Sequence, residues 1–278
     1  MDLVADTNVW YDIGAGTFSP STLKNGNRLL ATPVNHLEIC SNLTARSFSE
    51  RKAAASAILN HRDDTLEDPE THLANLWGIK RTPPSLNITA DLQRLASAAN
   101  PIALHMTVPL YPGSKTAASV GLSQWRTAHW DNFRDGIVQA IDTEVSGYAK
   151  ARANGRFKYL PGKNQPTLKA RLNSAAFRDE LIESTYRRVL VSEGKRQSSP
   201  TKALLTKTSS QLGPYASVYA QYIIGCACTF APQPNDFGDL ESFLYLQHGR
   251  VLLTSEKRWH KIAKAAGYAN IVVHPRDL

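Results

Sequence analysis

The first residues of the chain place an acid at the end of a short apolar run. Residues 3–5 are Leu-Val-Ala, which has the character of a buried strand, and Asp6 follows them at once, ahead of Thr7 and Asn8. In open α/β sheets, ligands bind outside the carboxyl ends of the parallel strands. Because Asp6 has no basic neighbour in the sequence, a carboxylate in this position suggests a cation site.

Two further acids have similar settings. Glu38 lies early in an expected helix that follows a second apolar strand. Glu256 lies two residues beyond Thr254, which closes a late strand. If these strands are parallel neighbours, their following residues meet at one edge of the sheet. The three acids are therefore candidates for a shared site.

A fourth acidic segment, Asn-Asp-Phe-Gly-Asp-Leu-Glu at residues 235–241, opens another expected helix. Asp239 lies one turn into this helix, where its side chain can point back over the sheet edge. Asp236 stands at the helix start, where an acid is more typical of a cap than of a metal ligand. Asp239 is the preferred member of the site, with Glu241 and Asp236 as alternatives.

Carboxylates gathered in this way favour a particular chemistry. Three or four of them in one pocket repel each other unless a cation compensates the charge. Hard oxygen ligands without Cys or His partners select Mg²⁺ or Mn²⁺ rather than zinc. Such a site activates water and stabilises the charge that develops on a phosphoryl group, with one metal ion or two.

The elements that must position these acids lie at the two ends of the chain. Short apolar strands are expected at residues 3–5, 28–32, 250–253 and 271–273, with helices at 33–39, 47–61 and 257–266. The middle of the chain has helical periodicity only, over 69–77, 89–99, 123–152, 167–193 and 199–212, and then a buried helix from Pro214 to before Pro232. We therefore expect an α/β fold whose central parallel sheet is built from residues 1–62 and 212–278, with an all-helical insertion at 63–211.

Charge is concentrated within that insertion. The 278-residue chain has a net charge of +8, yet residues 150–207 carry 14 Lys and Arg against four Asp and Glu, a local charge of +10. Long cations interleaved with aromatic residues suit a phosphate backbone with unstacked bases. A merely solvated helical face is the alternative. The expected nucleic-acid contacts are Arg156, Lys158, Lys163, Lys169, Arg171, Arg187 and Arg188.

Several functional classes find no support in the sequence. Three cysteines are too few for a disulfide framework, and Cys226 and Cys228 lack the partners of a zinc site. These features indicate free thiols in a reducing cytosol, and a cytoplasmic protein. The start of the chain lacks a secretory signal, and the uncharged run 212–235 is too polar to span a membrane. Trp77, Trp125 and Trp130 are interpreted as packing residues of the insertion.

Taken in order, the four acidic segments resemble those of PIN-domain nucleases. The similarity rests on Asp6-Thr7-Asn8 after the first strand, Glu38 in the segment 32–39, Asp239 at the head of a helix, and Thr254 with Glu256 in the segment 251–259. It covers residues 1–60 and 232–278. The family includes the toxins of bacterial toxin–antitoxin pairs.

The resemblance implies a PIN-like fold and a metal-dependent endoribonuclease that hydrolyses single-stranded RNA in the cytoplasm of a bacterium or in a phage. Asp6, Glu38 and Asp239 would hold Mg²⁺ or Mn²⁺, and Glu256 would hold a second ion or orient water. Asn8 and Thr254 would position these carboxylates by hydrogen bonds. A toxin or defence effector of this kind is held in check by an inhibitory partner, an antitoxin, and a homodimer is compatible with it.

The chain departs from the family in three respects. Glu256 stands where the family usually has Asp, and the third segment offers Asp236 and Glu241 beside Asp239. The helical insertion is also much larger than the few helices of small members. Two alternatives therefore stay open: a non-catalytic, nucleic-acid-binding protein with a PIN-like fold, and a DNA-directed nuclease of the flap type. Metal-dependent cleavage assays on RNA and DNA distinguish them.

Overall fold

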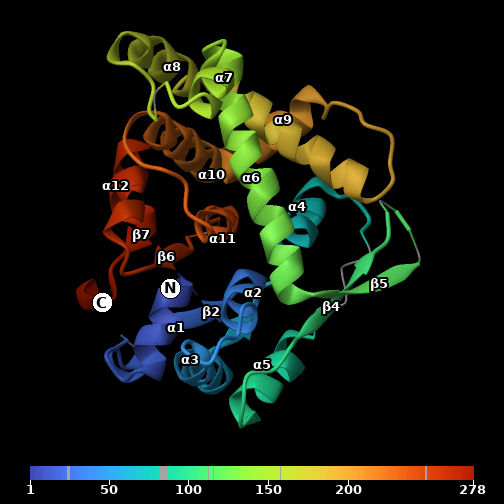
Figure 1. The fold of residues 1–278 in the computed structure, drawn as a ribbon, viewed down its shortest axis with the longest axis vertical. Helices are drawn as coiled ribbons and strands as arrows, with labels where there is room; N and C mark the ends of the chain where they lie inside the picture. Colours follow the sequence, from blue (N-terminus) through green and yellow to red (C-terminus); the bar gives the residue numbers. More distant parts are fainter. Residues whose placement is uncertain (24–25, 82–86, 112, 115, 157, 248) are drawn as a thin grey trace.

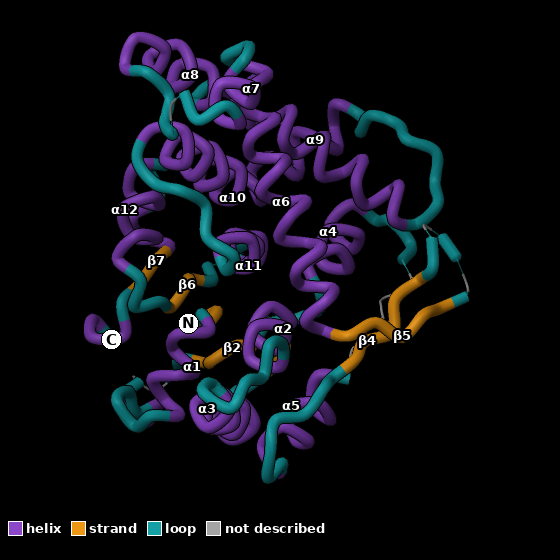
Figure 2. The backbone as a smooth tube through the Cα atoms, viewed as in Figure 1, coloured by secondary structure: helices purple, strands orange, loops and turns teal. Residues whose placement is uncertain are grey.

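A five-stranded parallel sheet lies at the centre of the α/β part of the molecule (Figure 2). Its strands are β1 (Asp2–Ala5), β2 (Arg28–Ala31), β3 (Asp64–Thr65), β6 (Val251–Leu253) and β7 (Val272–Val273). The order is β3-β2-β1-β6-β7, so strands from opposite ends of the chain pair with each other at β1 and β6. The expected joining of the two chain ends in one sheet is confirmed.

The strand order creates a switch point between β1 and β6. From β1 the chain proceeds outward to β2 and β3, and from β6 it proceeds in the opposite direction to β7. In doubly wound sheets, ligands bind in the crevice at such a point, outside the carboxyl ends of the strands. The residues that follow β1 and β6 are thus brought side by side.

Helices cover both faces of the sheet. Because alternate strand residues point in opposite directions, each strand contributes side chains to two cores. Leu3 and Leu253 face a core formed with α1 (Thr7–Gly14), α3 (Phe48–His61) and α5 (Ile88–Ser97). Val4 and Leu252 face a second core that continues into the helical region. Buried on both sides, the strands are short apolar runs without polar alternation, as parallel strands usually are.

The computed structural model describes residues 1–23, 26–81, 87–111, 113–114, 116–156, 158–247 and 249–278. Within these ranges, the remaining helices are α2 (Pro33–Cys40), α4 (Pro69–Trp77), α6 (Leu122–Glu144), α7 (Tyr148–Ala153), α8 (Gln165–Leu172), α9 (Ala175–Ser192), α10 (Lys202–Cys228), α11 (Asp236–Ser242) and α12 (Lys257–Ala265). Figure 1 shows α6 running from the neighbourhood of α2 to α7.

The expectation of an all-helical insertion is wrong in two places. β3 lies within residues 63–211 and pairs with β2 at the edge of the sheet. β4 (His105–Pro109) and β5 (Ala117–Gly121) form a separate antiparallel ribbon. The ribbon follows period-two burial, since Met106 is buried while its neighbours His105 and Thr107 are exposed. The alternation is too short to be recognised in the sequence.

Helix boundaries in the middle of the chain also differ from expectation. The expected helix 123–152 divides between Glu144, where α6 ends, and Gly147, the N-cap of α7, whose φ of 84° is left-handed. The expected helix 167–193 divides where Ser174 accepts a hydrogen bond from the amide of Phe177 and caps α9. Both divisions follow from local cap chemistry.

We expected a helix to begin at Pro214. Instead, Pro214 lies inside the 27-residue α10. A proline within a helix removes one backbone hydrogen bond and costs about 3 kcal/mol. The helix continues because its following turns are buried along their length, with Tyr215, Tyr222 and Ile223 each at most 5% exposed. Burying one such large apolar side chain contributes about 1.5–3 kcal/mol, so the packing outweighs the missing bond.

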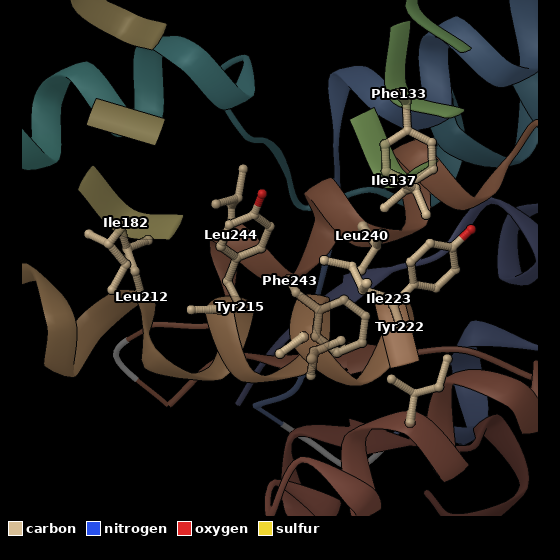
Figure 3. Close-up of a cluster of buried hydrophobic side chains, with 14 of the residues drawn as sticks. Phe133, Ile137, Ile182, Leu212, Tyr215, Tyr222, Ile223, Leu240, Phe243 and Leu244 are labelled. Atoms are coloured by element: carbon tan, nitrogen blue, oxygen red, sulfur yellow. The ribbon is translucent and has the colours of Figure 1, made fainter. Parts of the chain in front are cut away.

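One apolar core joins the sheet to the helical region. Figure 3 shows Phe133 and Ile137 of α6 and Tyr222 of α10 gathered around Leu240 of α11. The same cluster contains Val4 and other residues of the sheet. The helical region is therefore packed onto the sheet through α10 and α11. No described helix is long and apolar enough to cross a membrane.

Candidate active site

The carboxyl ends of β1 and β6 hold a hydrogen-bonded pair of acids. Asp6 follows β1, and its Oδ2 accepts a 2.6 Å hydrogen bond from the hydroxyl of Thr254, which follows β6. Asn8 donates from Nδ2 to Glu256 Oε1 at 2.8 Å and to Asp6 Oδ2 at 3.4 Å. The amide of Glu256 donates to the Thr254 hydroxyl. The four residues form one network at the switch point.

Glu38 is brought to this network by the way α2 is anchored. Thr32 and Asn35 form a capping box at the start of the helix. Asn35 then donates from Nδ2 to the carbonyl of Ala5 and to the Thr7 hydroxyl, both at 3.1 Å. The helix is thereby tied to the end of β1. Glu38 lies one turn further on and is only 7% exposed.

Asp239 is held on α11 by an aromatic donor. The indole Nε1–H of Trp259 donates to Asp239 Oδ2 at 2.9 Å, and both residues are buried. The preceding residue is Gly238, where a Cβ would lie 2.6 Å from Val34 and 3.1 Å from Glu38 Oε1. The absence of a side chain therefore allows α11 to approach α2. This approach brings Asp239 towards Glu38.

All four predicted acids line one small cavity of about 40 Å³: Asp6, Glu38, Asp239 and Glu256. Asn8, predicted as a supporting residue, also lines it. The other predicted supporting residue, Thr254, is buried beneath the cavity and binds Asp6. Residues 250 positions apart in the sequence thus meet because β1 and β6 are paired.

Burial and mutual repulsion disfavour the ionised forms of these acids. Burial raises the pKa of Asp6 to about 6, against the hydrogen bond from Thr254. Burial also raises the pKa of Glu38 to about 7, against hydrogen bonding to Thr7 and the charge of Arg126. The pKa of Asp239 is raised well above its usual range by burial and then by the charges of Asp6 and Glu38. A cation in the cavity would reverse these effects.

Three arginines that sequence reasoning missed stand beside the acids. Arg51 of α3 lines the cavity and donates to the carbonyls of Glu38 and Ser41. Arg126 of α6 lies 3.9 Å from Glu38 Oε1 and donates to Asn235. Arg258 of α12 forms an ion pair with Asp236 and lies 3.4 Å from Glu256 Oε2. Nothing in the sequence marks Arg126, because its helix lies in the insertion. Arg258 could have been noticed as the arginine two residues after Glu256.

The residue types that line the cavity suit a divalent ion, but their side chains are not arranged as a complete coordination shell. Its acidic lining offers oxygen donors only, and no described Cys or His lines it, which favours Mg²⁺ or Mn²⁺. Among the described residues, however, no three His, Cys, Asp or Glu side chains are arranged as a metal-binding group. Binding an ion here requires the carboxylates to turn towards one another.

The two alternative acids of α11 have other surroundings. Asp236 is the first residue of the helix, not its N-cap, and it accepts hydrogen bonds from the Tyr222 hydroxyl at 2.6 Å and the Gln233 amide at 2.7 Å. With Arg258 as its ion-pair partner, it ties α10 and α12 to α11. Glu241 lines different cavities, and burial raises its pKa to about 8 against the charge of Arg188. Neither lines the cavity of the four acids.

The seven predicted nucleic-acid contacts do not lie together. Arg171 is paired with Glu144 and Glu180, and Arg187 with Glu183. Four exposed cations are at the α7–α8 end of the helical region: Arg156, Lys158, Lys163 and Lys169. Arg188 is exposed on α9, where it lines a different cavity. In Figure 1 the α7–α8 end is remote from α2, and the length of α6 alone separates Arg126 from Glu144 by about 27 Å.

Comparison with known proteins finds no matching family, no matching curated protein and no matching solved structure.

Proposed function

We propose that this chain is a Mg²⁺- or Mn²⁺-dependent endoribonuclease with a PIN-like fold, which hydrolyses phosphodiester bonds of single-stranded RNA. The observation that supports it best is the convergence of Asp6, Glu38, Asp239 and Glu256 on one cavity at the switch point of the sheet. Buried carboxylates that raise one another's pKa are costly, and such arrangements are concentrated at functional sites.

In this proposal the acids hold the ion through their oxygens. Asp6, Glu38 and Asp239 are the ligands, and Glu256 binds a second ion or orients the attacking water. When bound, the ion activates water and stabilises the charge on the phosphoryl oxygens. Thr254 and Trp259 donate to Asp6 and Asp239, which fixes the orientation of these two carboxylates.

Arg126 and Arg258 suit the substrate rather than the ion. A guanidinium matches the oxygens of a phosphate with paired, charge-assisted hydrogen bonds. Arg126 lines the cavity, and Arg258 lies at its edge beside Glu256. On this proposal they move from the carboxylates to the phosphodiester once metal is bound. The exposed cations of the α7–α8 end then bind only a distant part of a long RNA.

The ion pairs also favour a second candidate function. Because Arg258 is within 4 Å of Asp236, Asp239 and Glu256, arginine charge already compensates part of the acidic cluster. A non-catalytic, nucleic-acid-binding protein needs no more than this. It binds RNA but cleaves neither RNA nor DNA with either metal, whereas a DNA-directed nuclease cuts single-stranded or branched DNA.

The test is metal-dependent cleavage by the wild-type chain and two matched variants. Labelled single-stranded RNA, single-stranded DNA and branched duplexes are incubated with Mg²⁺ or Mn²⁺. Asp6→Asn should reduce RNA cleavage by at least about 10³-fold, because it removes a ligand charge. Asp12→Asn is the control, since Asp12 lies on the same helix and bonds to Thr17 instead. Cleavage that survives in Asp6→Asn would refute the proposal.

The role of a toxin or defence effector with an inhibitory partner belongs to the same proposal. Expression of the wild-type chain should arrest bacterial growth, and expression of Asp6→Asn should not. Equal growth of both strains, at equal protein levels, would contradict this role without affecting the nuclease assay.

A further inference from the structure

A second and larger cavity lies on the other side of α11. It measures about 360 Å³ and is enclosed by residues of α6, α9, α10 and α11, with Glu70 of α4 at its edge. An adjoining cavity of about 200 Å³ shares Glu70, His129, Phe237 and Glu241 with it. We refer to the two cavities together as the chamber. Its volume falls in the range of small-molecule sites, about 300–1,000 Å³.

Aromatic rings form a continuous wall of the chamber. The ring of His129 is 3.7 Å from that of Trp125 and 5.8 Å from that of Phe237, with an angle of 27° to the latter. Phe133 continues the wall, 5.5 Å from Phe237 and 6.4 Å from Tyr219. Burial lowers the pKa of His129, so its imidazole is neutral and presents a flat face. Such walls stack planar rings.

An arginine and a glutamate line the chamber without forming an ion pair with each other. Arg81 balances the nearby acids, at 3.6 Å from Asp68 and 2.9 Å from Glu70. Arg188, which is exposed, and Glu241, which is half-buried, also line the chamber and attract each other, but within the described part of the chain neither side chain forms a hydrogen bond or an ion pair. They are therefore more than 4 Å apart, with space between them. A ligand that offers acceptors to one and donors to the other would satisfy both.

A small cavity lies between the chamber and the acidic cavity. A small intervening cavity of about 30 Å³ is lined by Glu38 and Arg126, which also line the acidic cavity. Its other walls include His129, Phe237 and Glu241, which line the chamber. A nucleotide with its phosphate near the acids thus has a polar and aromatic cavity next to it. Trp125, which we expected to be a packing residue, lines this intervening cavity.

We propose that the chamber binds a guanine base, either of the RNA strand or of a free nucleotide. Guanine presents the acceptors O6 and N7, which arginine binds with two hydrogen bonds. Its N1–H and N2–H groups are adjacent donors for a carboxylate such as Glu241. Adenine places a donor, N6–H, where guanine has O6, and would oppose Arg188. The strand form of the proposal rests on the proposed nuclease function, and the free-nucleotide form does not.

The first experiment measures binding without catalysis. Guanosine 5′-monophosphate and adenosine 5′-monophosphate are titrated into the full chain by isothermal calorimetry, without metal. The guanine nucleotide should bind at least about tenfold more tightly. Arg188→Gln and Glu241→Gln should each weaken it by about tenfold or more. Arg187→Gln is the matched control, because Arg187 is exposed and paired with Glu183.

A second pair of variants tests the location. Asn132, Gly136 and Ser184 line the chamber and are exposed, so they mark its opening between α6 and α9. A Cβ at Gly136 would meet nothing within 4 Å, so Gly136→Ala should leave binding unchanged. Gly136→Trp should fill the opening and abolish it. If both variants have the circular-dichroism spectrum and the unfolding midpoint of the wild-type chain, both are folded.

The strand form is tested by mapping the cuts in a mixed-sequence RNA. Wild type should cut at a fixed position relative to guanine, and Glu241→Gln should lower the ratio of cuts at that position to cuts elsewhere. Preference in RNA without nucleotide binding supports the strand alone, and nucleotide binding without preference supports the free ligand. If neither guanine preference nor nucleotide binding is found, the proposal is overturned. If the nucleotide binds but no nucleic acid is cut, only the nuclease proposal fails.

Discussion

At the scale of single residues, Asp6 and Glu256 show how the site departs from ordinary helix design. Both occupy N-cap positions, of α1 and α12 respectively, yet neither side chain caps its helix. An acid in this position usually accepts a hydrogen bond from the helix backbone. Here the side chains are bonded to Thr254 and Asn8 instead. Local helix stability is therefore given up for a cluster of acids.

The raised pKa values predict how stability depends on pH in the absence of metal. Since the pKa values of Asp6 and Glu38 rise to about 6 and about 7 on folding, the folded chain holds more protons than the unfolded chain above pH 4. The contribution of these two protonated acids to the free energy of unfolding is therefore lost as pH increases through 7. The loss is on the order of 2–3 kcal/mol for Asp6 alone.

The measurement is the unfolding midpoint of the metal-free protein between pH 4.5 and 7.5. Wild type should lose more stability over this range than Asp6→Asn, whereas Asp12→Asn should follow wild type. Addition of Mg²⁺ or Mn²⁺ at pH 7.5 should raise the wild-type midpoint, because an ion that binds only the folded state stabilises it. A midpoint that rises equally in Asp6→Asn would exclude Asp6 as a ligand.

Trp259 gives a second prediction at this scale. Trp259→Phe retains an aromatic ring but removes the indole donor to the buried Asp239. Leaving a buried acceptor unsatisfied costs about 1–3 kcal/mol, which urea unfolding should detect. Cleavage should fall as well, because Asp239 loses its orientation. Trp77→Phe is a control in the same apolar core, remote from the acids; an equal loss of activity there would indicate a general packing effect.

At the scale of elements, the site depends on how closely α11 approaches α2. The contact is possible because Gly238 has no side chain towards Val34 and Glu38. Arg126 then links α6 to the same place by binding Asn235, just before α11, and the hydroxyl of Ser41, just after α2. The helices α2, α6 and α11, which come from distant parts of the sequence, are thus held together around the cavity by hydrogen bonds and close packing. Their positions relative to the sheet decide whether the acids converge.

Gly238→Ala tests this approach. Its Cβ would lie 2.6 Å from Val34, so the helices must separate, at a cost of about 1–3 kcal/mol. RNA cleavage should fall by at least about tenfold, since a small misplacement of catalytic groups is costly. Gly136→Ala is the matched control: it meets open space in α6 and should stabilise the helix by about 0.5–1 kcal/mol. Comparable activity and stability in the two variants would contradict the proposed role of Gly238.

At the scale of the whole molecule, the sheet and the helical region are one packed unit on the side of α10. The core that includes Val4 of β1 also includes Leu212 of α10 and Ile182 of α9. An insertion connected only by linkers would have a core of its own. The helical region is instead part of the support on which α11, and hence Asp239, rests.

This shared core predicts a single unfolding transition. Leu212→Ala in the helical region and Leu252→Ala in the sheet should each lower the stability of the whole molecule by about 2–5 kcal/mol. Calorimetry should show one peak that moves as a unit, with coincident near- and far-ultraviolet circular dichroism. Two peaks, of which only one responds to Leu212→Ala, would show that the helical region is independent.

Much of the sheet and of the acidic set was predictable because both leave local patterns. The apolar runs before Asp6 and Thr254 predict strands, and the four strands we expected are present within two residues of their expected ends. β3 and the β4–β5 ribbon were not predicted. In strands of two to five residues with weak alternation, the sequence pattern cannot be distinguished from that of a loop. Pro214 misled us because a helix buried over many turns tolerates the loss of one hydrogen bond.

By itself, then, the sequence determined which acids end strands or open helices, since backbone preferences and apolar patterns act over a few residues. Only the tertiary structure decided that Asp239 faces Glu38 while Glu241, two residues on, faces Arg188. The rotation of a helix is set by what it packs against, as α11 is set by Val34, Tyr222 and Trp259. Those partners come from distant parts of the chain, and no local pattern records where they meet.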